Sequence, residues 1–327
     1  MALQYYGLKG AEMKFINYSG NGIYQVIVHP DTKPASALAP GKYALRLHQP
    51  NYMKSESISS EMDWLSALHQ AGVPVPKPFR NQESDWLTVV GENHDLVGRR
   101  NCTLIGWTEG RILKKRILPK HFRELGVVIG RMHEQSRSWK RPKGFARPHW
   151  DWEGLFGDGF GYGAPALETH NAIPKGHQNI FNETLRKVQE TTEQLGKGKN
   201  TYGLIHADLS LLDNVTFLAG KAYPFDFDDC GFGYWIFDLA VLLAHYFSDF
   251  TNTSTTLQDA LIAGYKETSP LENIGFEYLD LFIAARYAQL MFFYQSCAIR
   301  YPRVLEEAMI EVNKYAIDLK HTLKKIT

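Results

Sequence analysis

The stretch that decides the fold is residues 201–240, TYGLIHADLSLLDNVTFLAGKAYPFDFDDCGFGYWIFDLA. Two short apolar runs, 202–205 and 222–225, each lead directly into polar residues. The polar residues that follow the two runs are His206, Asp208, Asp213, Asn214, Asp226, Asp228 and Asp229. Charges beside apolar runs are costly unless they are paired or bind a cation. One arrangement that satisfies so many carboxylates is a site that holds a divalent metal and a polyphosphate.

The composition around this stretch is that of a globular protein of about two domains. The chain has 327 residues, of which 44% are hydrophobic and 22% charged, and its formal net charge is +1. Such a balance gives no strong field to recruit nucleic acid or a membrane surface. Three widely spaced cysteines favour a reducing compartment over a disulfide framework or a zinc site. We therefore expect a cytoplasmic protein, because segment 1–15 lacks a signal-peptide pattern and no apolar run is long enough to span a membrane.

The first hundred residues are predicted to form a small sheet with one helix. Alternating or β-branched runs at 23–28, 43–48, 86–90 and 102–107 indicate strands. The segment 55–71 has apolar residues at helical spacing and is followed by Gly72, which is typical of a helix end. The sequence TEGR at 108–111 then breaks the strand pattern, so we place a domain boundary near residues 106–110.

The rest of the chain is mostly helical in pattern. Apolar residues recur at helical spacing in segments 121–135, 181–195, 238–247, 257–266, 276–299 and 304–324. Residues 144–176 are rich in Gly, Pro, His and Trp, and such a length favours a functional loop or lid. The predicted fold class is α+β, with a small antiparallel-sheet domain that contains one helix at 1–106 and a larger, mostly helical domain at 107–327.

Two features of the first domain are candidates for binding phosphate. Small residues at 19–22 would let backbone amides approach a phosphate, although an ordinary hairpin turn is the favoured interpretation of this segment taken alone. Glu61 falls among the apolar positions of the predicted helix, where it is placed to pair with Arg46 on the preceding strand. The alternative for Glu61 is a solvated helix residue.

The central stretch supplies the groups that phosphoryl transfer requires. Asp208, on a loop just past an apolar strand, can accept a hydrogen bond from a substrate hydroxyl and orient it for attack. Asn214 offers a neutral oxygen suited to magnesium, and Asp226 can bridge magnesium to phosphate oxygens. These three side chains are therefore expected to meet at one site.

The same residues resemble the catalytic core of the aminoglycoside phosphotransferase and choline kinase family, which includes homoserine kinase-type enzymes. The family's His-x-Asp loop with a following Asn corresponds to residues 206–208 with Asn214. Its later acidic segment and its Asp-Leu-Ala correspond to FDFD at 225–228 and DLA at 238–240. The order of further matches, from 19–26 through 59–78, 102–111 and 124–136, holds over nearly the whole chain.

This resemblance implies a bilobal protein-kinase-like fold that uses ATP and Mg²⁺, with a nucleotide-binding lobe at 1–106 and a catalytic and substrate lobe at 107–327. Asp208 corresponds to the catalytic base or hydroxyl-orienting group, and Asn214 and Asp226 correspond to the magnesium ligands. His206 and Asp238 correspond to residues that hold the loop. Asp228 and Asp229 are either assistants to the metal or structural acids. On the nucleotide side, the residues that correspond to binding positions are Gly20, Asn21, Gly22, Arg46, Glu61 and Trp107.

Two departures from the family pattern stand out. Arg46 occupies the position of the family's lysine, and its fork of donors can still grip phosphate. Lys42 is the less favoured substitute, because it precedes the strand. The family places Asn five positions after the catalytic Asp, where this chain has Asp213. Either Asn214 or Asp213 is therefore the metal ligand of this loop. Asn214 is favoured, because residues 213–215, Asp-Asn-Val, match the end of the loop in the family.

The sequence thus predicts a phosphotransferase that moves the γ-phosphate of ATP to a hydroxyl of a small molecule, such as an amino alcohol, a hydroxy amino acid like homoserine, or an aminoglycoside. Alternatives are a Ser/Thr protein kinase of the same fold and a nucleotide-binding pseudokinase, which the departures at Arg46 and the loop favour. A metal-dependent phosphohydrolase is less favoured, because histidine-rich ligand sets are missing. Trp150, Asp151 and Arg286 are candidates for the wall of the acceptor site.

Overall fold

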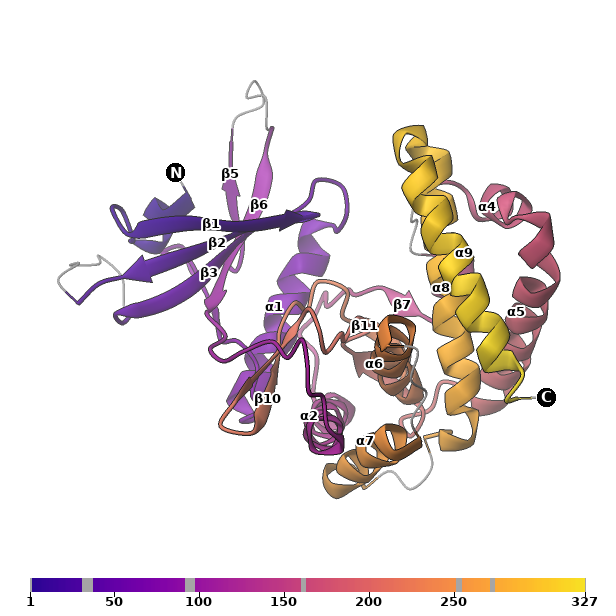
Figure 1. Cartoon of the computed structure of the whole chain (residues 1–327). Helices are drawn as coiled ribbons and strands as arrows, with labels where there is room; N and C mark the ends of the chain where they lie inside the picture. The colour runs from indigo at the N-terminus through magenta and orange to yellow at the C-terminus, as the bar shows by residue number, and fades with distance from the viewer. Residues whose placement is uncertain are drawn as a thin grey trace. The chain divides into compact units, whose positions relative to one another are not determined.

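The computed structural model describes residues 2–30, 38–91, 98–159, 163–250, 255–270 and 274–326. It divides into two compact units, one made of Met1–Gly110 with Lys140–Ala146 and the other of Arg111–Trp139 with Arg147–Thr327 (Figure 1). The first unit holds an antiparallel sheet with one long helix, and the second is mostly helical. The predicted α+β class is therefore confirmed. The assignment of nucleotide binding to residues 1–106 and catalysis to 107–327 stays a prediction.

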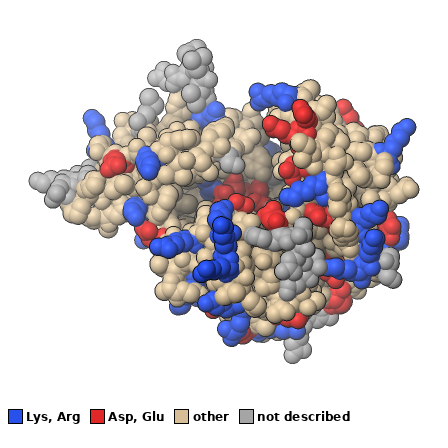
Figure 2. Space-filling model, in the orientation of Figure 1, with Lys and Arg blue, Asp and Glu red and all other residues tan. Residues whose placement is uncertain are grey.

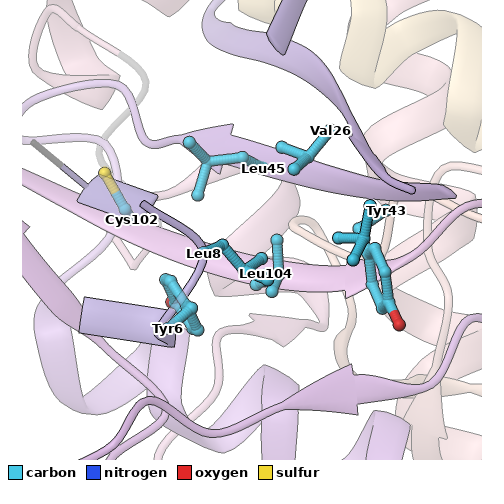
Figure 3. Close-up of a cluster of buried hydrophobic side chains, with 8 residues drawn as sticks. Tyr6, Leu8, Val26, Tyr43, Leu45, Cys102 and Leu104 are labelled. Carbon is cyan, nitrogen blue, oxygen red and sulfur yellow. The ribbon is translucent and has the colours of Figure 1, made fainter. Parts of the chain in front are cut away.

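The sheet of the first unit is antiparallel throughout. Its strand order is β1 (Glu12–Ser19), β2 (Asn21–Val28), β3 (Gly41–Leu47), β6 (Arg100–Gly106) and β4 (Pro78–Phe79), with β5 (Thr88–Val90) also paired to β6. The 3₁₀ turn η1 (Ala2–Tyr6) precedes β1, and its Tyr6 joins an apolar cluster on the sheet (Figure 3). The labelled members of this cluster are Tyr6, Leu8, Val26, Tyr43, Leu45, Cys102 and Leu104.

The single long helix of this unit, α1 (Ser55–Gln70), matches the predicted segment 55–71. It buries Ile58, Met62, Leu65 and Leu68, which recur at helical spacing along one face. Glu61 is buried on the same helix. The helix ends before Gly72, whose φ of +73° is easily adopted by glycine and turns the chain away.

Six long helices lie in the described part of the second unit. They are α2 (Pro119–Ser138), α5 (Lys175–Leu195), α6 (Trp235–Phe250), α7 (Thr255–Thr268), α8 (Leu279–Arg300) and α9 (Leu305–Leu323). The 3₁₀ turns η2 (Phe276–Tyr278) and η3 (Pro302–Val304) precede α8 and α9. α2 packs against α7, and α8 packs along α9. None of the helices that the structure describes combines the length and apolarity needed to cross a bilayer.

The segment 144–176 is not the long loop that its composition predicts. Its described residues include β7 (His149–Trp150), α3 (Trp152–Phe156), α4 (Ala166–Ala172) and the start of α5. The side chain of Asp151 caps α3 by accepting a hydrogen bond from the N–H of Gly154 at 3.0 Å. Local capping therefore orders a segment whose Gly and Pro content suggested irregular structure.

Two small sheets bring the decisive stretch together. In one, β7 and β8 (Tyr202–Ile205) flank β11 (Gly231–Tyr234), and β8 runs antiparallel to β11 with Ile205 opposite Gly231. In the other, β9 (Val215–Leu218) and β10 (Lys221–Pro224) form a hairpin. The loop that follows β8 and the loop that precedes β11 consequently emerge at the same end of the sheet.

Charged side chains are interspersed over the surface seen in Figure 2, where Lys and Arg lie among Asp and Glu. This distribution accords with the formal net charge of +1. On that face no single sign dominates the described surface, which is the condition expected of a protein without a strong steering field.

The crossing of α2 and α7 depends on two glycines and gives a test of the packing. A Cβ atom on Gly126 would lie 2.1 Å from the carbonyl oxygen of Leu261, and one on Gly264 would lie 1.9 Å from that of Arg123. Because backbone atoms cannot move aside cheaply, Gly126→Ala is expected to lower the free energy of unfolding by about 1–3 kcal/mol. Chemical denaturation measures this.

Gly176→Ala is the matched control for that substitution. Gly176 lies in the first turn of α5, and a Cβ there meets nothing within 4 Å. Alanine should stabilise the protein by about 0.4–1 kcal/mol, because it restricts the unfolded chain. Equal effects of the two substitutions would contradict the close approach of α2 and α7.

Candidate active site

The loops that follow β8 and β10 each contain a residue with an unusual backbone conformation. Ala207 and Asp226 have φ of +69° and +67°, a region that residues with a Cβ seldom adopt. Both lie where polar residues follow an apolar strand. Such conformations persist only where the surroundings enforce them, and they cluster at functional sites.

Asp238, in the first turn of α6, holds the β8 loop in place. Its Oδ2 accepts a hydrogen bond from the N–H of His206 at 2.9 Å, and its Oδ1 accepts one from the N–H of Ala207 at 2.7 Å. His133 of α2 donates from Nε2 to the same carboxylate at 3.0 Å, and its Nδ1 lies 3.0 Å from the hydroxyl of Tyr265. The side chains of His133 and Asp238 are fully buried.

The ionisation of Asp238 follows from these bonds. Burial acts to raise the pKa of the Asp238 carboxyl, but the hydrogen bond from His133, the charges of His133 and His206, and the backbone bond from His206 lower it below its ordinary value. The carboxylate is therefore charged at neutral pH and able to serve as a threefold acceptor. This is the scaffolding position that the resemblance implied for Asp238 and His206.

Asn214 closes the loop that begins at Asp208. Its Nδ2 donates to the backbone oxygen of Asp208 at 2.6 Å, and its Oδ1 accepts from the N–H of Ser210 at 2.7 Å. Asn214 is 5% exposed, whereas the side chain of Asp213 is 71% exposed and lies 3.7 Å from Lys114. The extra residue of the loop is thus accommodated as an outward-facing Asp213, which favours Asn214 over Asp213 as the loop ligand.

The β9–β10 hairpin places Asp226 beside this loop. Phe225 donates its N–H to the backbone oxygen of Asn214 at 2.9 Å, and Nε2 of His206 lies 3.2 Å from the backbone oxygen of Phe225. Asp226 follows directly in the chain. Asn214 thus bonds Asp208 directly and is linked by a backbone hydrogen bond to Phe225, the residue before Asp226. That the side chains of Asp208, Asn214 and Asp226 meet at one metal site stays a prediction.

The segment after Asp226 is anchored by two residues from the β7 region. Arg147 donates to the backbone oxygens of Cys230 and Asp228, each at 2.5 Å, and the Trp150 indole donates to that of Asp229 at 2.8 Å. Trp150 is 3% exposed. Trp150 thus anchors this loop, and its place on an acceptor wall stays a prediction.

Asp208 itself carries a strongly stabilised negative charge. Arg286 of α8 donates from Nη2 to Oδ1 of Asp208 at 2.5 Å, and Nε2 of His245 lies 3.6 Å from the same oxygen. Burial acts to raise the pKa of Asp208, whereas His245 and the guanidinium of Arg286 lower it, and the net value is about 2. Asp208 is therefore a carboxylate at neutral pH, suited to orienting a hydroxyl by accepting its hydrogen bond.

In the first unit, the predicted ion pair between Arg46 and Glu61 is present. Arg46 of β3 donates from Nη2 to Oε1 of Glu61 on α1, and the two side chains are 3% and 1% exposed. Lys42, the less favoured substitute, instead pairs with Glu109 at 3.1 Å, and its side chain is 46% exposed. Arg46 is therefore the buried cation of this sheet.

Gly20 forms the tight turn between β1 and β2, and Asn21 and Gly22 are the first residues of β2. Ser19 is opposite Asn21 across Gly20, whose φ is +77°, so the hairpin alternative describes the backbone correctly. Oδ1 of Asn21 accepts a hydrogen bond from the N–H of Gln49 at 2.9 Å. Trp107 follows β6, is partly buried and donates its N–H to the backbone oxygen of Lys42 at 3.2 Å. Nucleotide contacts at these positions stay predictions.

Three relationships missed by the sequence complete the site. His133 bonds Asp238 across 105 residues, and Arg286 and His245 approach Asp208 from two helices, α8 and α6. Each of these side chains lies in a helix whose apolar pattern predicts a buried core segment. A buried arginine or histidine in such a pattern needs a polar partner, which is the one local signal that they carried.

Comparisons with known proteins identify the family and the fold of this chain. The model of the phosphotransferase enzyme family (APH) matches residues 31–275. Amicoumacin kinase of Bacillus subtilis is 25% identical over 248 residues, which cover 73% of this chain and 64% of that protein. A Synechocystis protein is 25% identical over 232 residues, 70% of this chain and 60% of its own length. The match thus spans less than two thirds of either relative.

Solved structures share the fold at low sequence identity. A microcompartment-associated aminopropanol kinase has a TM-score of 0.79 at 24% identity, with 99% of this chain and 96% of that chain covered. An amicoumacin kinase in complex with AMP-PNP, Ca²⁺ and Ami has a TM-score of 0.73 at 20% identity, covering 94% and 88%. The predicted protein-kinase-like fold is therefore confirmed, and the chain belongs to the phosphotransferase enzyme family.

Proposed function

We propose that this protein is an ATP- and Mg²⁺-dependent phosphotransferase that transfers the γ-phosphate of ATP to a hydroxyl group of a small molecule. The observation that carries this proposal is the linked set of Asp208, Asn214 and Asp226, with Asp208 charged and partly exposed. Membership of the phosphotransferase family supports it. Both lines point to the same chemistry from independent features.

Asp208 accepts the hydrogen bond of the acceptor hydroxyl and directs its oxygen at the γ-phosphorus. A bond forms between that oxygen and phosphorus while the bond to the β–γ bridging oxygen breaks, and ADP leaves. The transition state of such transfers is loose, so little basicity is needed before the new bond forms. A carboxylate with a pKa of about 2 fits this role, since it positions the hydroxyl and the proton finally passes to solvent.

Asn214 and Asp226 would hold the magnesium ion, which supplies charge neutralisation to the phosphate oxygens. Mg²⁺ takes few protein ligands and keeps water and phosphate oxygens for the others. One amide oxygen and one carboxylate, at the adjoining ends of a loop and a hairpin, are a suitable oxygen donor set. The left-handed backbone of Asp226 turns the chain at that point.

On the nucleotide side, Arg46 would contact phosphate oxygens, and Glu61 would keep its guanidinium oriented. This role is assigned from the position of Arg46 in the family pattern and from its buried ion pair with Glu61, because a guanidinium presents its donors in a fork that matches phosphate oxygens. Backbone amides of 20–22 would cover the phosphates, and Trp107 would border the adenine. The relative solved with AMP-PNP and Ca²⁺ supports a nucleotide and divalent cation as ligands of this fold.

For the acceptor, we propose an amino alcohol, a hydroxy amino acid such as homoserine, or an aminoglycoside-like compound. The name of one similar protein, an aminopropanol kinase, supports the first of these classes, and another similar protein is an amicoumacin kinase. These activities belong to those proteins. A panel of hydroxyl compounds from each class therefore decides among them.

The proposed function is tested by ADP formation from ATP and Mg²⁺ across that panel. We expect turnover with at least one acceptor and loss of turnover when the divalent cation is chelated. Asp226→Ala should abolish the dependence of nucleotide binding on Mg²⁺, because it removes the bridging carboxylate. Calorimetric titration of ATP at several Mg²⁺ concentrations measures this.

Lys221→Ala is the control for Asp226→Ala, since Lys221 is an exposed residue of the adjoining hairpin. An unchanged Mg²⁺ titration in Asp226→Ala would exclude that residue as a ligand. Tight ATP binding by the unaltered protein without turnover on any alcohol would instead indicate a pseudokinase. Phosphate release without an acceptor would indicate a hydrolase.

A further inference from the structure

Arg286 is a buried cation in the most apolar part of the second unit. It is 5% exposed and lies on α8 among neighbours such as Ala284, Ala285 and Ala288, which are fully buried. A guanidinium removed from water in this way costs several kcal/mol unless its donors are paired. Retaining it therefore requires a specific set of partners.

Those partners are on three separate elements. Nη1 of Arg286 donates to Oε1 of Gln289, one turn along α8, at 2.8 Å. Nη2 donates to Oδ1 of Asp208 at 2.5 Å and lies 2.9 Å from Nε2 of His245 on α6. Gln289 is 3% exposed, so the guanidinium plane is held by packing and by this amide. The guanidinium of Arg286 is therefore held in one orientation where it donates to Asp208.

The two oxygens of the Asp208 carboxylate have different surroundings, because the contacts with Arg286 and His245 involve only one of them. The contacts of Arg286 and His245 with that carboxylate both involve Oδ1. The Asp208 side chain is nevertheless 38% exposed, and neither of these contacts involves Oδ2. A charged hydrogen bond as short as 2.5 Å resists rotation of the carboxylate about its Cβ–Cγ bond.

We propose that Arg286 is a positioning residue of the phosphoryl transfer, which holds Asp208 by Oδ1 so that Oδ2 accepts the hydrogen bond of the acceptor hydroxyl. This inference rests on the proposed function. Arg286 acts through Asp208 and needs no contact with the acceptor or the nucleotide. Gln289 orients the guanidinium, and His245 limits its sideways movement.

Such a role has a distinctive kinetic consequence. An acceptor oxygen aimed wrongly by about 1 Å loses roughly 10²-fold in the chemical step. Nucleotide binding, which involves other residues in the proposal, is not expected to change. Loss of Arg286 should therefore lower kcat and leave the KM for ATP in place. Because a smaller folded fraction would also lower the apparent kcat, kcat is referred to the concentration of folded, nucleotide-binding protein.

The test compares Arg286→Met, Arg286→Lys and the unaltered protein, with the acceptor of the panel that gives the highest turnover. Arg286→Met should lower kcat by about 10²–10³-fold and change the KM for ATP by less than about twofold. Arg286→Lys keeps a donor and a charge, so its kcat should be at least about tenfold higher than that of Arg286→Met. Thermal denaturation with Mg²⁺ and AMP-PNP verifies that each variant is folded and binds nucleotide.

Arg300→Met is the matched control, because Arg300 is an exposed arginine at the end of the same helix. It should keep normal kcat. Normal kcat in Arg286→Met, or equal kcat in Arg286→Met and Arg286→Lys, would overturn the positioning role while leaving the kinase proposal intact. Absence of ADP from the unaltered protein with every acceptor would overturn the kinase proposal and the role of Arg286 together.

Discussion

Asp208→Asn is expected to lower the rate of ADP formation by about 10³-fold or more, while the affinity for ATP and Mg²⁺ changes by less than about twofold. Asparagine has the same shape but lacks the charge that Arg286 and His245 stabilise. Its amide would also present a donor where the acceptor hydroxyl needs an acceptor. The transfer step therefore loses its orienting group, and binding of nucleotide does not.

Steady-state kinetics and calorimetric titration measure the two parts of this prediction. Asp259→Asn, an exposed aspartate of α7, is the control and should have normal turnover. Near-normal turnover in Asp208→Asn would show that Asp208 is not the group that orients the hydroxyl. Equal loss of ATP binding and turnover would place Asp208 in nucleotide binding instead.

The strands around Asp208 show which local signals could be read from the sequence. β8 and β10 are short runs of apolar and aromatic residues and were predicted at 202–205 and 222–225. β11 was missed, because Gly231 and Gly233 weaken the strand pattern. Those glycines are required by packing, since a Cβ on Gly233 would lie 2.3 Å from Cδ1 of Ile205. Close strand packing thus removes the signal by which strands are recognised.

The candidate site was predictable where its residues follow one another. Asp208, Asn214 and Asp226 lie within 19 residues at the ends of apolar strands, and Glu61 was predicted to pair with Arg46 from helical spacing. The pair of Arg286 with Asp208 spans 78 residues, and that of His133 with Asp238 spans 105. Partners so distant are selected by helix packing, for which one sequence provides no local pattern.

The exposed Asp213 shows how packing resolves an ambiguity of spacing. Counting along the chain from Asp208 left Asp213 and Asn214 as alternatives. Burial separates them, because an amide can satisfy its donor and acceptor inside the loop, whereas a second carboxylate there would add an unpaired charge. Asn214 does so with Asp208 and Ser210, and Asp213 turns outward toward Lys114.

Asp238→Asn is expected to lower the free energy of unfolding at pH 7 by about 3–5 kcal/mol and to abolish turnover. Asparagine keeps the volume of the side chain, but its amide donor would face N–H groups of His206 or His133 that now donate to Asp238. The loop that holds Ala207 at a φ of +69° would lose its restraint, and Asp208 would lose its position with it.

The pH dependence distinguishes this network from a general packing effect. The pKa of Asp238 is lowered in the folded protein, so its stabilisation is fully present above the unfolded value of about 4 and is lost as the pH falls through the lower folded value. Thermal denaturation between pH 7 and pH 3 should therefore show a steeper loss of stability for the unaltered protein and for Asp259→Asn than for Asp238→Asn. Parallel pH curves for all three would show that the Asp238 charge contributes nothing to stability, and that the loop is held by packing alone.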